Sequence, residues 1–127
     1  MSLRIGLSVF AFGAALAAAA CNSSSGPSHA DLCANSGAAV TVTITDYAFT
    51  PADINVIAGQ SVCWQNTGHM THTVTDNVAG RFNASVPSGQ TFVYTFGFQE
   101  GYAYHCTIHS TMTGSVSVGC KPGELSC

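Results

Sequence analysis

Apolar and polar residues alternate along most of the chain between residues 40 and 118, and this period of two constrains the fold more than any other feature. Val40, Val42 and Ile44 alternate with three threonines. Successive side chains of a strand point to opposite faces of a sheet, so the pattern is typical of a half-buried strand. Six later segments repeat it: Ile54 and Val56, Val62 and Trp64, His72 and Val74, Phe92 to Phe96, Tyr102 and Tyr104, Val116 and Val118. No stretch shows an apolar stripe with the 3.6-residue period of a helix.

These segments predict an all-β protein, an antiparallel Greek-key β-sandwich or barrel of about seven to eight strands. The length of 127 residues allows one domain. Three Lys and Arg against six Asp and Glu exclude a basic nucleic-acid surface. The sequence also contains no glycine-rich phosphate loop and no Gly-x-Ser-x-Gly motif. We therefore expect no nucleic-acid partner and no small-molecule substrate.

The N-terminus has the features of an export signal, which we place at residues 1–20. Arg4 supplies the positive start, and the uncharged run that follows is shorter than the ~20 residues of a membrane-spanning helix. Small residues precede Cys21 as in a bacterial lipobox, in which the cysteine is acylated, although Leu16 stands two positions earlier than usual. The alternative is cleavage after Ala-x-Ala, which leaves Cys21 as a free or paired thiol.

A Ser-, Gly- and Pro-containing segment follows the signal, as expected of a tether. We predict a lipid-anchored flexible tether at residues 21–37, a folded domain at 38–120 and a disulfide-linked tail at 121–127. The predicted location is the bacterial cell envelope, periplasmic or on the outer surface, with the protein held to a membrane through Cys21.

One short segment carries a thiol, an imidazole and a thioether at the spacing Cys106-x2-His109-x2-Met112. A loop of this length can direct all three side chains to one centre, and His72 supplies a second imidazole from upstream. Two His, one Cys and a weak axial Met are the ligands of a blue-copper electron-transfer site, because sulfur favours Cu(I) and imidazole suits both oxidation states. The segment therefore predicts a copper site.

The sequence resembles the cupredoxins, the type 1 blue copper proteins, and most closely their amicyanin and plastocyanin branch. Residues 102–118 read Tyr-x-Tyr-His-Cys-Thr-x-His-x-x-Met-x-Gly-x-Val-x-Val, almost as in amicyanin. Val62-x-Trp64-x-Asn66, followed after five residues by His72, also matches. Phe49-x-Pro51, Ile54-x-Val56 and Gly59 fall where the family places them. The likeness covers about residues 40 to 118.

This resemblance implies a single copper ion with His72, Cys106 and His109 as equatorial ligands and Met112 as the axial ligand. It implies that Asn66 joins the upstream loop to the ligand loop through hydrogen bonds near Thr107, and that the backbone N–H of Thr73 points at the Cys106 sulfur. Such bonds would hold the site geometry and tune its potential.

The resemblance further implies that His109 shows its ring edge at the surface among apolar groups such as Met70 and Ile108. In the family, electrons enter and leave through that patch. Thr71, Ile108 and Ser110 stand where amicyanin-like loops have proline, so we expect a looser loop and an altered potential. Charged residues are too sparse to outline a docking surface like that of plastocyanin.

We therefore expect a carrier of single electrons between extracytoplasmic redox proteins, and not an enzyme. The alternative is a copper storage or delivery protein of the bacterial envelope. Such a protein would prefer exchangeable Met- and His-rich ligands, and the chain has only three Met, one of them Met1.

Six cysteines in so short a chain indicate an oxidising compartment or a metal site. If Cys21 is acylated and Cys106 binds metal, four remain as disulfide candidates: Cys33, Cys63, Cys120 and Cys127. Four cysteines allow three pairings, and the sequence leaves the choice open. In a cupredoxin topology we expect all four at the pole opposite the copper, where two bridges would pin the termini.

Overall fold

The computed structural model describes residues 33–127. The expected signal peptide and Cys21 lie outside the described residues. The described part contains nine strands: β1 (Val40–Thr45), β2 (Ala48–Thr50), β3 (Asp53–Ile57), β4 (Ser61–Asn66), β5 (His72–Asp76), β6 (Asn83–Val86), β7 (Thr91–Thr95), β8 (Gly101–His105) and β9 (Thr113–Gly119). In residues 33–127 no helix has the length and apolar character needed to cross a membrane.

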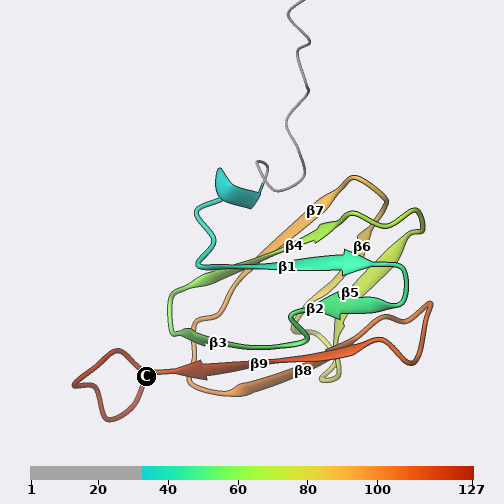
Figure 1. The fold of residues 1–127 in the computed structure, drawn as a ribbon. Coiled ribbons are helices and arrows are strands. Elements are labelled where there is room, and N and C mark those ends of the chain that lie inside the picture. Colours follow the sequence, from blue (N-terminus) through green and yellow to red (C-terminus); the bar gives the residue numbers. More distant parts are fainter. Residues whose placement is uncertain (1–32) are drawn as a thin grey trace, which may run out of the picture.

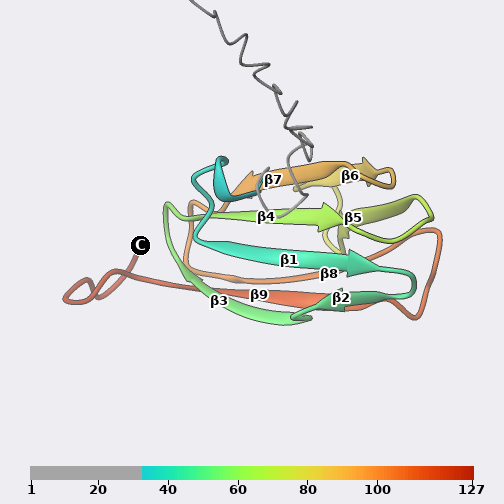
Figure 2. The same cartoon turned by 45° about the horizontal axis from the view of Figure 1, so that its top comes forward.

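The strands form two sheets that face each other as a sandwich (Figures 1 and 2). The first sheet has the order β2-β1-β4-β7 and the second the order β3-β9-β8-β5-β6. The predicted all-β sandwich is confirmed, with nine strands where about seven to eight were expected. The two strands outside the seven alternating segments are β2, which pairs with β1 before the chain crosses to the other sheet at residues 51–52, and β6, which pairs with β5.

Two of the strand pairs are parallel and not antiparallel. β1 pairs in parallel with β4, and β3 with β9. Each pair joins strands that other strands separate along the chain, so no tight hairpin turn constrains the two strands to be antiparallel. Parallel and antiparallel strands share the same side-chain period, so the sequence pattern does not distinguish them.

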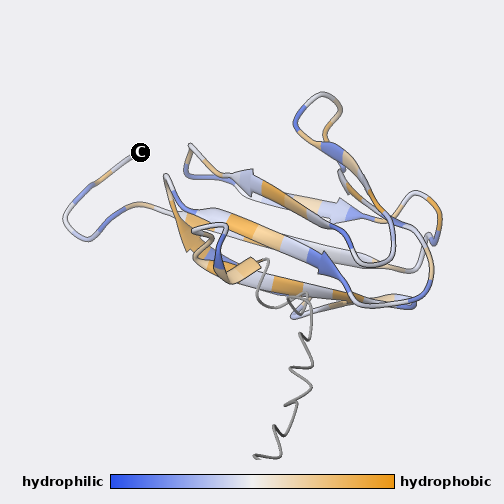
Figure 3. Ribbon diagram, turned by 90° about the horizontal axis from the view of Figure 1, so that it is seen from above, coloured by the Kyte–Doolittle hydropathy of each residue, from blue (hydrophilic) through white to orange (hydrophobic). Residues whose placement is uncertain are grey.

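The space between the sheets is filled by the apolar members of the alternating segments, and Figure 3 shows hydrophobic and hydrophilic residues alternating along the strands. Trp64 lies at the centre of an aromatic cluster and is fully buried. Its ring stacks on Phe92 at 5.6 Å and meets the Tyr104 ring edge-on at 5.5 Å. Because Tyr104 comes from the opposite sheet, this cluster joins the two layers.

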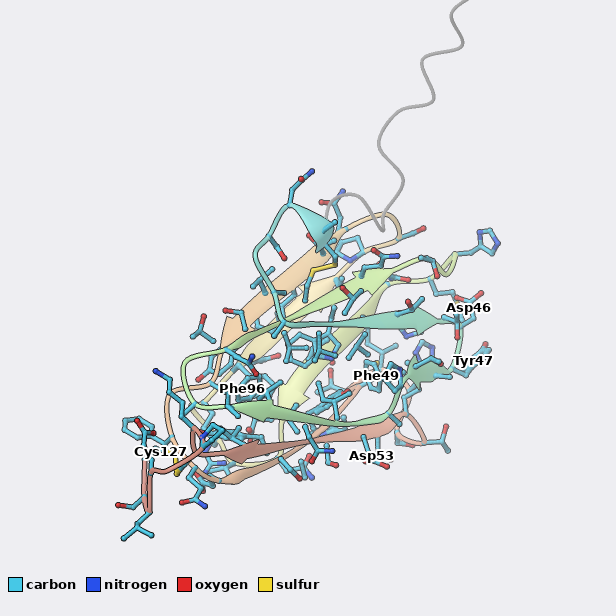
Figure 4. All side chains as sticks on the ribbon, turned by 60° about the vertical axis from the view of Figure 1, so that its left-hand side comes forward. Asp46, Tyr47, Phe49, Asp53, Phe96 and Cys127 are labelled. Atoms are coloured by element: carbon cyan, nitrogen blue, oxygen red, sulfur yellow. A yellow bond between two sulfur atoms is a disulfide. The ribbon has the colours of Figure 1, made fainter. Side chains whose placement is uncertain are left out.

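Three connections meet at one end of the sandwich, the right-hand end in Figures 1 and 2. They are the turn between β1 and β2, the connection between β4 and β5, and the connection between β8 and β9. The C-terminal tail leaves from the opposite end, and Figure 4 shows Asp46 and Tyr47 far from Cys127. The fold therefore brings together segments that are distant in the sequence.

The four candidate cysteines form two disulfides, Cys33–Cys63 and Cys120–Cys127. The expectation that all four gather at one pole is wrong. Val62 and Trp64 point into the core, so Cys63 between them faces outward, and its bridge attaches Cys33 to the outer face of the first sheet. This bridge ties the last residues of the expected tether to the domain. The second bridge ties Cys127 back to Cys120, directly after β9, and so closes the tail into a loop.

Candidate metal centre

Cys106, His72 and His109 form a cluster at the end of the sandwich where the three connections meet. His72 is the first residue of β5, and Cys106 follows directly after β8. The Cys106 Sγ atom lies 3.9 Å from His72 Nδ1 and 3.8 Å from His109 Nδ1, and the two Nδ1 atoms are 3.1 Å apart. Cys106 is buried and is the free cysteine of the described residues. These three donor atoms could hold a metal ion.

The size and chemistry of this triangle fit a transition metal. A point in its plane lies about 2.1 Å from all three donor atoms, which is the length of a metal–imidazole nitrogen bond in proteins. A thiolate and two imidazoles suit copper in both oxidation states. Since Cys106 and His72 are fully buried, the centre is shielded from water on the core side.

The segment from Cys106 to Met112 is a compact loop closed by its own backbone. The Cys106 N–H donates to the Met112 carbonyl at 3.0 Å, and the Met112 N–H donates to the His109 carbonyl at 2.9 Å. Met112 is buried, with 1% of its surface exposed, and belongs to the core cluster. These backbone bonds therefore hold Cys106, His109 and Met112 close to one another.

Thr73 connects the ligand loop to β5. Its backbone N–H donates to the Cys106 sulfur at 3.3 Å, as the resemblance implied. Its Oγ1 accepts a hydrogen bond from the Thr107 N–H at 2.8 Å and lies 3.1 Å from the Thr107 hydroxyl. Thr73 and Thr107 thus join the two segments that supply the donor atoms.

Asn66 does not bond near Thr107, and that expectation is wrong. Its side-chain Nδ2 donates to the carbonyls of Met70 and Val86, at 2.7 and 2.8 Å, while its Oδ1 accepts from the Gly68 N–H at 2.9 Å. Asn66 closes the connection between β4 and β5 on itself and fastens it to the end of β6. The hydroxyl of Thr73 makes the link that we expected of Asn66.

Burial lowers the pKa of His72, and the nearby His109 acts in the same direction, whereas the Asp46 carboxylate opposes the shift. A lowered pKa keeps the imidazole neutral, which is the form that binds a metal. Desolvation raises the pKa of Asp46, but bonds from the backbone N–H groups of Met70 and His69 outweigh it and leave the value below its usual range. His72 is therefore held in its neutral form, beside the ionised carboxylate of Asp46.

Two residues at this end, Asp46 and Tyr47, were missed by the sequence analysis. Asp46 Oδ1 lies 3.6 Å from His72 Nε2. The Tyr47 ring meets the His109 ring edge-on, with centroids 5.1 Å apart. Neither residue belongs to a motif, and only the pairing of β1 with β2 brings their turn to the site.

The predicted docking residues lie at the same end. Ile108 is exposed and Met70 is half-buried, beside a half-buried His109. The hydroxyl of Tyr47 is 4.0 Å from the Met70 sulfur. Tyr47, Met70 and Ile108 thus place apolar groups around His109, among exposed polar residues of the same connections such as Thr71 and Ser110.

Residues 36–119 match the family described as copper binding proteins, plastocyanin/azurin family. The chain belongs to this family. The expected cupredoxin identity is confirmed, and together with the His72, Cys106 and His109 triangle it assigns one copper ion to the centre. No individually curated protein sequence matches the chain significantly.

Solved structures of cupredoxins are similar to this chain. A reduced amicyanin with a substituted proline is 29% identical, with a TM-score of 0.62 over 72% of this chain and 90% of that one. A purple cupredoxin from Nitrosopumilus maritimus has a TM-score of 0.60 and 21% identity, covering 63% of this chain and 99% of its own. A copper-containing nitrite reductase from Thermus scotoductus has a TM-score of 0.58 and 23% identity over 65% of this chain, but only 22% of the reductase. The last two support the fold alone.

Proposed function

We propose that this protein is a type 1 blue copper protein that carries single electrons between redox proteins outside the cytoplasm, and that it is not an enzyme. The observation that carries the proposal is the buried, unpaired Cys106 thiol within 4 Å of two imidazole nitrogens. In the proposed site His72, Cys106 and His109 would hold the copper ion, with the Met112 thioether as a weaker fourth ligand. Copper held in this way supplies a centre that accepts and returns one electron.

The protein's own contribution is a donor set that keeps one shape. His72 is fixed by the β5 strand, and the Thr73 N–H fixes the Cys106 sulfur. The closed backbone of the 106–112 loop fixes His109 and Met112 relative to Cys106. Hydrogen bonds around the ligands hold their orientation and tune the metal. A centre built in this way changes charge with little rearrangement, which is what fast electron transfer requires.

We infer that partners dock over Met70 and Ile108, where His109 comes nearest to the surface. Among the three connections that meet at this end, all within the described residues, Asp46 is the single Asp, Glu, Lys or Arg. Electron-transfer rates with redox proteins should therefore depend only weakly on ionic strength, because screening acts on charged surfaces. A steep salt dependence would argue against docking at this surface.

We also propose that the protein is anchored in the bacterial envelope through an acylated Cys21. Small residues precede this cysteine as in a lipobox. The two disulfides of the described domain are typical of oxidising compartments and support export. Mass spectrometry of the mature N-terminus distinguishes the lipid-modified cysteine from an unmodified one.

The decisive experiment is titration of the purified protein with Cu(II), followed by visible and EPR spectroscopy through cycles of oxidation and reduction. We expect one copper per chain, an intense thiolate-to-copper band in the visible spectrum, as typical of blue copper sites, and reversible cycling. The Cys106→Ser variant should lose the colour but keep its β fold by circular dichroism. Met112→Leu should stay blue with a shifted potential.

Two results would contradict the proposal. Colour retained in Cys106→Ser would overturn the ligand assignment. Colourless copper that a chelator removes readily from the parent protein would favour storage or delivery over electron transfer.

A further inference from the structure

The Tyr47 backbone adopts a left-handed conformation, with φ 73°, and Tyr47 is the one non-glycine residue of the described chain with a positive φ. It is the second residue of the two-residue turn between Thr45 and Ala48, which pair across the hairpin. Glycine and asparagine are preferred at positive φ in such turns, because a larger side chain is strained there. The side chain of Tyr47 is 61% exposed, so burial does not explain why a tyrosine occupies this position.

The contacts of the Tyr47 ring supply an explanation. The ring meets the His109 ring at an interplanar angle of 80°, with centroids 5.1 Å apart, which is the favourable edge-to-face arrangement. Its hydroxyl lies 4.0 Å from the Met70 sulfur. Met70 belongs to the connection between β4 and β5, and His109 to that between β8 and β9. One exposed side chain therefore touches both of these connections.

The neighbouring residue fixes the turn in place. Asp46 Oδ1 accepts hydrogen bonds from the backbone N–H groups of His69 at 3.0 Å and Met70 at 3.3 Å. A Cβ atom on Gly68 would collide with the same carboxylate, which shows how closely the turn packs on this connection. Tyr47 is thus presented to His109 from an anchored backbone. Figure 4 shows Asp46 and Tyr47 together at this end of the molecule.

Among the three donor residues of the triangle, His109 depends most on such support. His72 and Cys106 are fully buried, while His109 is half-buried and lies in the loop between two strands. The loss of a ligand to solvent would therefore begin at His109. An aromatic ring packed against its imidazole restricts that movement.

We propose that Tyr47 is a positioning residue of the copper centre, which holds the imidazole of His109 in its ligating orientation. The strained backbone at residue 47 is retained because the ring must reach His109. This inference rests on the proposed ligand role of His109. It assigns to the β1–β2 turn a part in holding the metal that no ligand motif reveals.

The test compares Tyr47→Gly with Tyr47→Phe. Glycine removes the ring and suits the left-handed backbone, so the copper-free glycine variant should be at least as stable as the parent in urea unfolding. Its release of Cu(I) to a chelator should nevertheless be faster by about two- to tenfold, the range expected for the loss of one aromatic pair. Tyr47→Phe keeps the ring and should release Cu(I) within about twofold of the parent. The EPR spectrum should change in the glycine variant only.

The outcomes separate this inference from the proposed function. A blue parent whose glycine variant releases copper at the parent rate, with an unchanged EPR spectrum, overturns the role of Tyr47 alone. A phenylalanine variant that loses copper as fast as the glycine variant also overturns it, because the ring would then not be the group that matters. A parent that takes up no copper overturns both.

Discussion

Thr73 serves the metal centre through two different groups, one on its backbone and one on its side chain. The backbone N–H donates to the Cys106 sulfur, and the hydroxyl accepts from the Thr107 N–H. Thr73 is largely buried, with 8% of its surface exposed. A single residue of β5 thus holds both the Cys106 sulfur and the next residue of the ligand loop, Thr107.

Thr73→Val keeps the shape of the side chain and the N–H bond to sulfur but removes the hydroxyl. We expect the free energy of unfolding of the copper-free protein to fall by about 1 kcal/mol, because the Thr107 N–H loses its acceptor. Urea denaturation followed by circular dichroism measures this loss. Thr73→Ser retains the hydroxyl and serves as the control. A valine variant as stable as the parent would show that the link between Thr73 and Thr107 does not stabilise the loop.

At the scale of elements, the β8–β9 hairpin carries the ligand loop and depends on close packing across its two strands. Tyr104 pairs with Gly114 across the hairpin, and its hydroxyl donates to the Ala52 carbonyl at 3.4 Å. Burial raises the pKa of Tyr104 to about 12, so its hydroxyl stays protonated at neutral pH. The missing side chain at Gly114 leaves room for this ring directly beneath the site.

Gly114→Ala should therefore destabilise the hairpin. The added Cβ would lie 2.6 Å from the Ala52 carbonyl oxygen and still closer to the Tyr104 ring. Such overpacking costs roughly 1–3 kcal/mol, which thermal unfolding of the copper-free protein would reveal as a lower Tm. Gly101→Ala, in the same hairpin, meets no atom within 4 Å and is the matched control. Equal Tm values for the two variants would contradict this account.

At the scale of the whole molecule, the two disulfides have different consequences. Cys33–Cys63 joins residues 30 apart and attaches the segment before β1 to the first sheet. Cys120–Cys127 joins residues 7 apart within a tail that is exposed between them. A bridge stabilises a fold when it restricts the unfolded chain more than the folded one. The first bridge meets this condition, whereas the second closes a segment that lies outside the core in either state.

We expect that replacing Cys33 and Cys63 together by alanine lowers the free energy of unfolding by about 3–4 kcal/mol, from the loop-closure entropy. The matching double substitution of Cys120 and Cys127 should change it by no more than about 0.5 kcal/mol, as for other surface changes. Urea denaturation of both variants under identical conditions makes the comparison. A larger loss from the tail bridge would mean that the tail packs on the domain.

The sequence determined the fold class and the donor set of the site. Period-two alternation predicts which face of each strand is buried, because the direction of a side chain in a strand is a local property. The spacing of Cys106, His109 and Met112 is equally local, since a short loop keeps these residues near one another. The sequence also offered His72 as a second imidazole from a distant segment, the family resemblance named it as a ligand, and the structure places it in the same cluster.

Three features were decided only by the tertiary structure: the parallel strand pairs, the disulfide partners, and the residues that support the ligands from other elements. Asn66 was expected to reach Thr107, yet the packing of β5 against β8 gives that contact to Thr73. Tyr47 and Asp46 reach the centre only because β2 pairs with β1 and turns their hairpin toward it. The local spacing of residues determines which side chains a segment can direct to one centre. Which distant segments contact it depends on how the two sheets align, and that alignment is a property of the packed core as a whole.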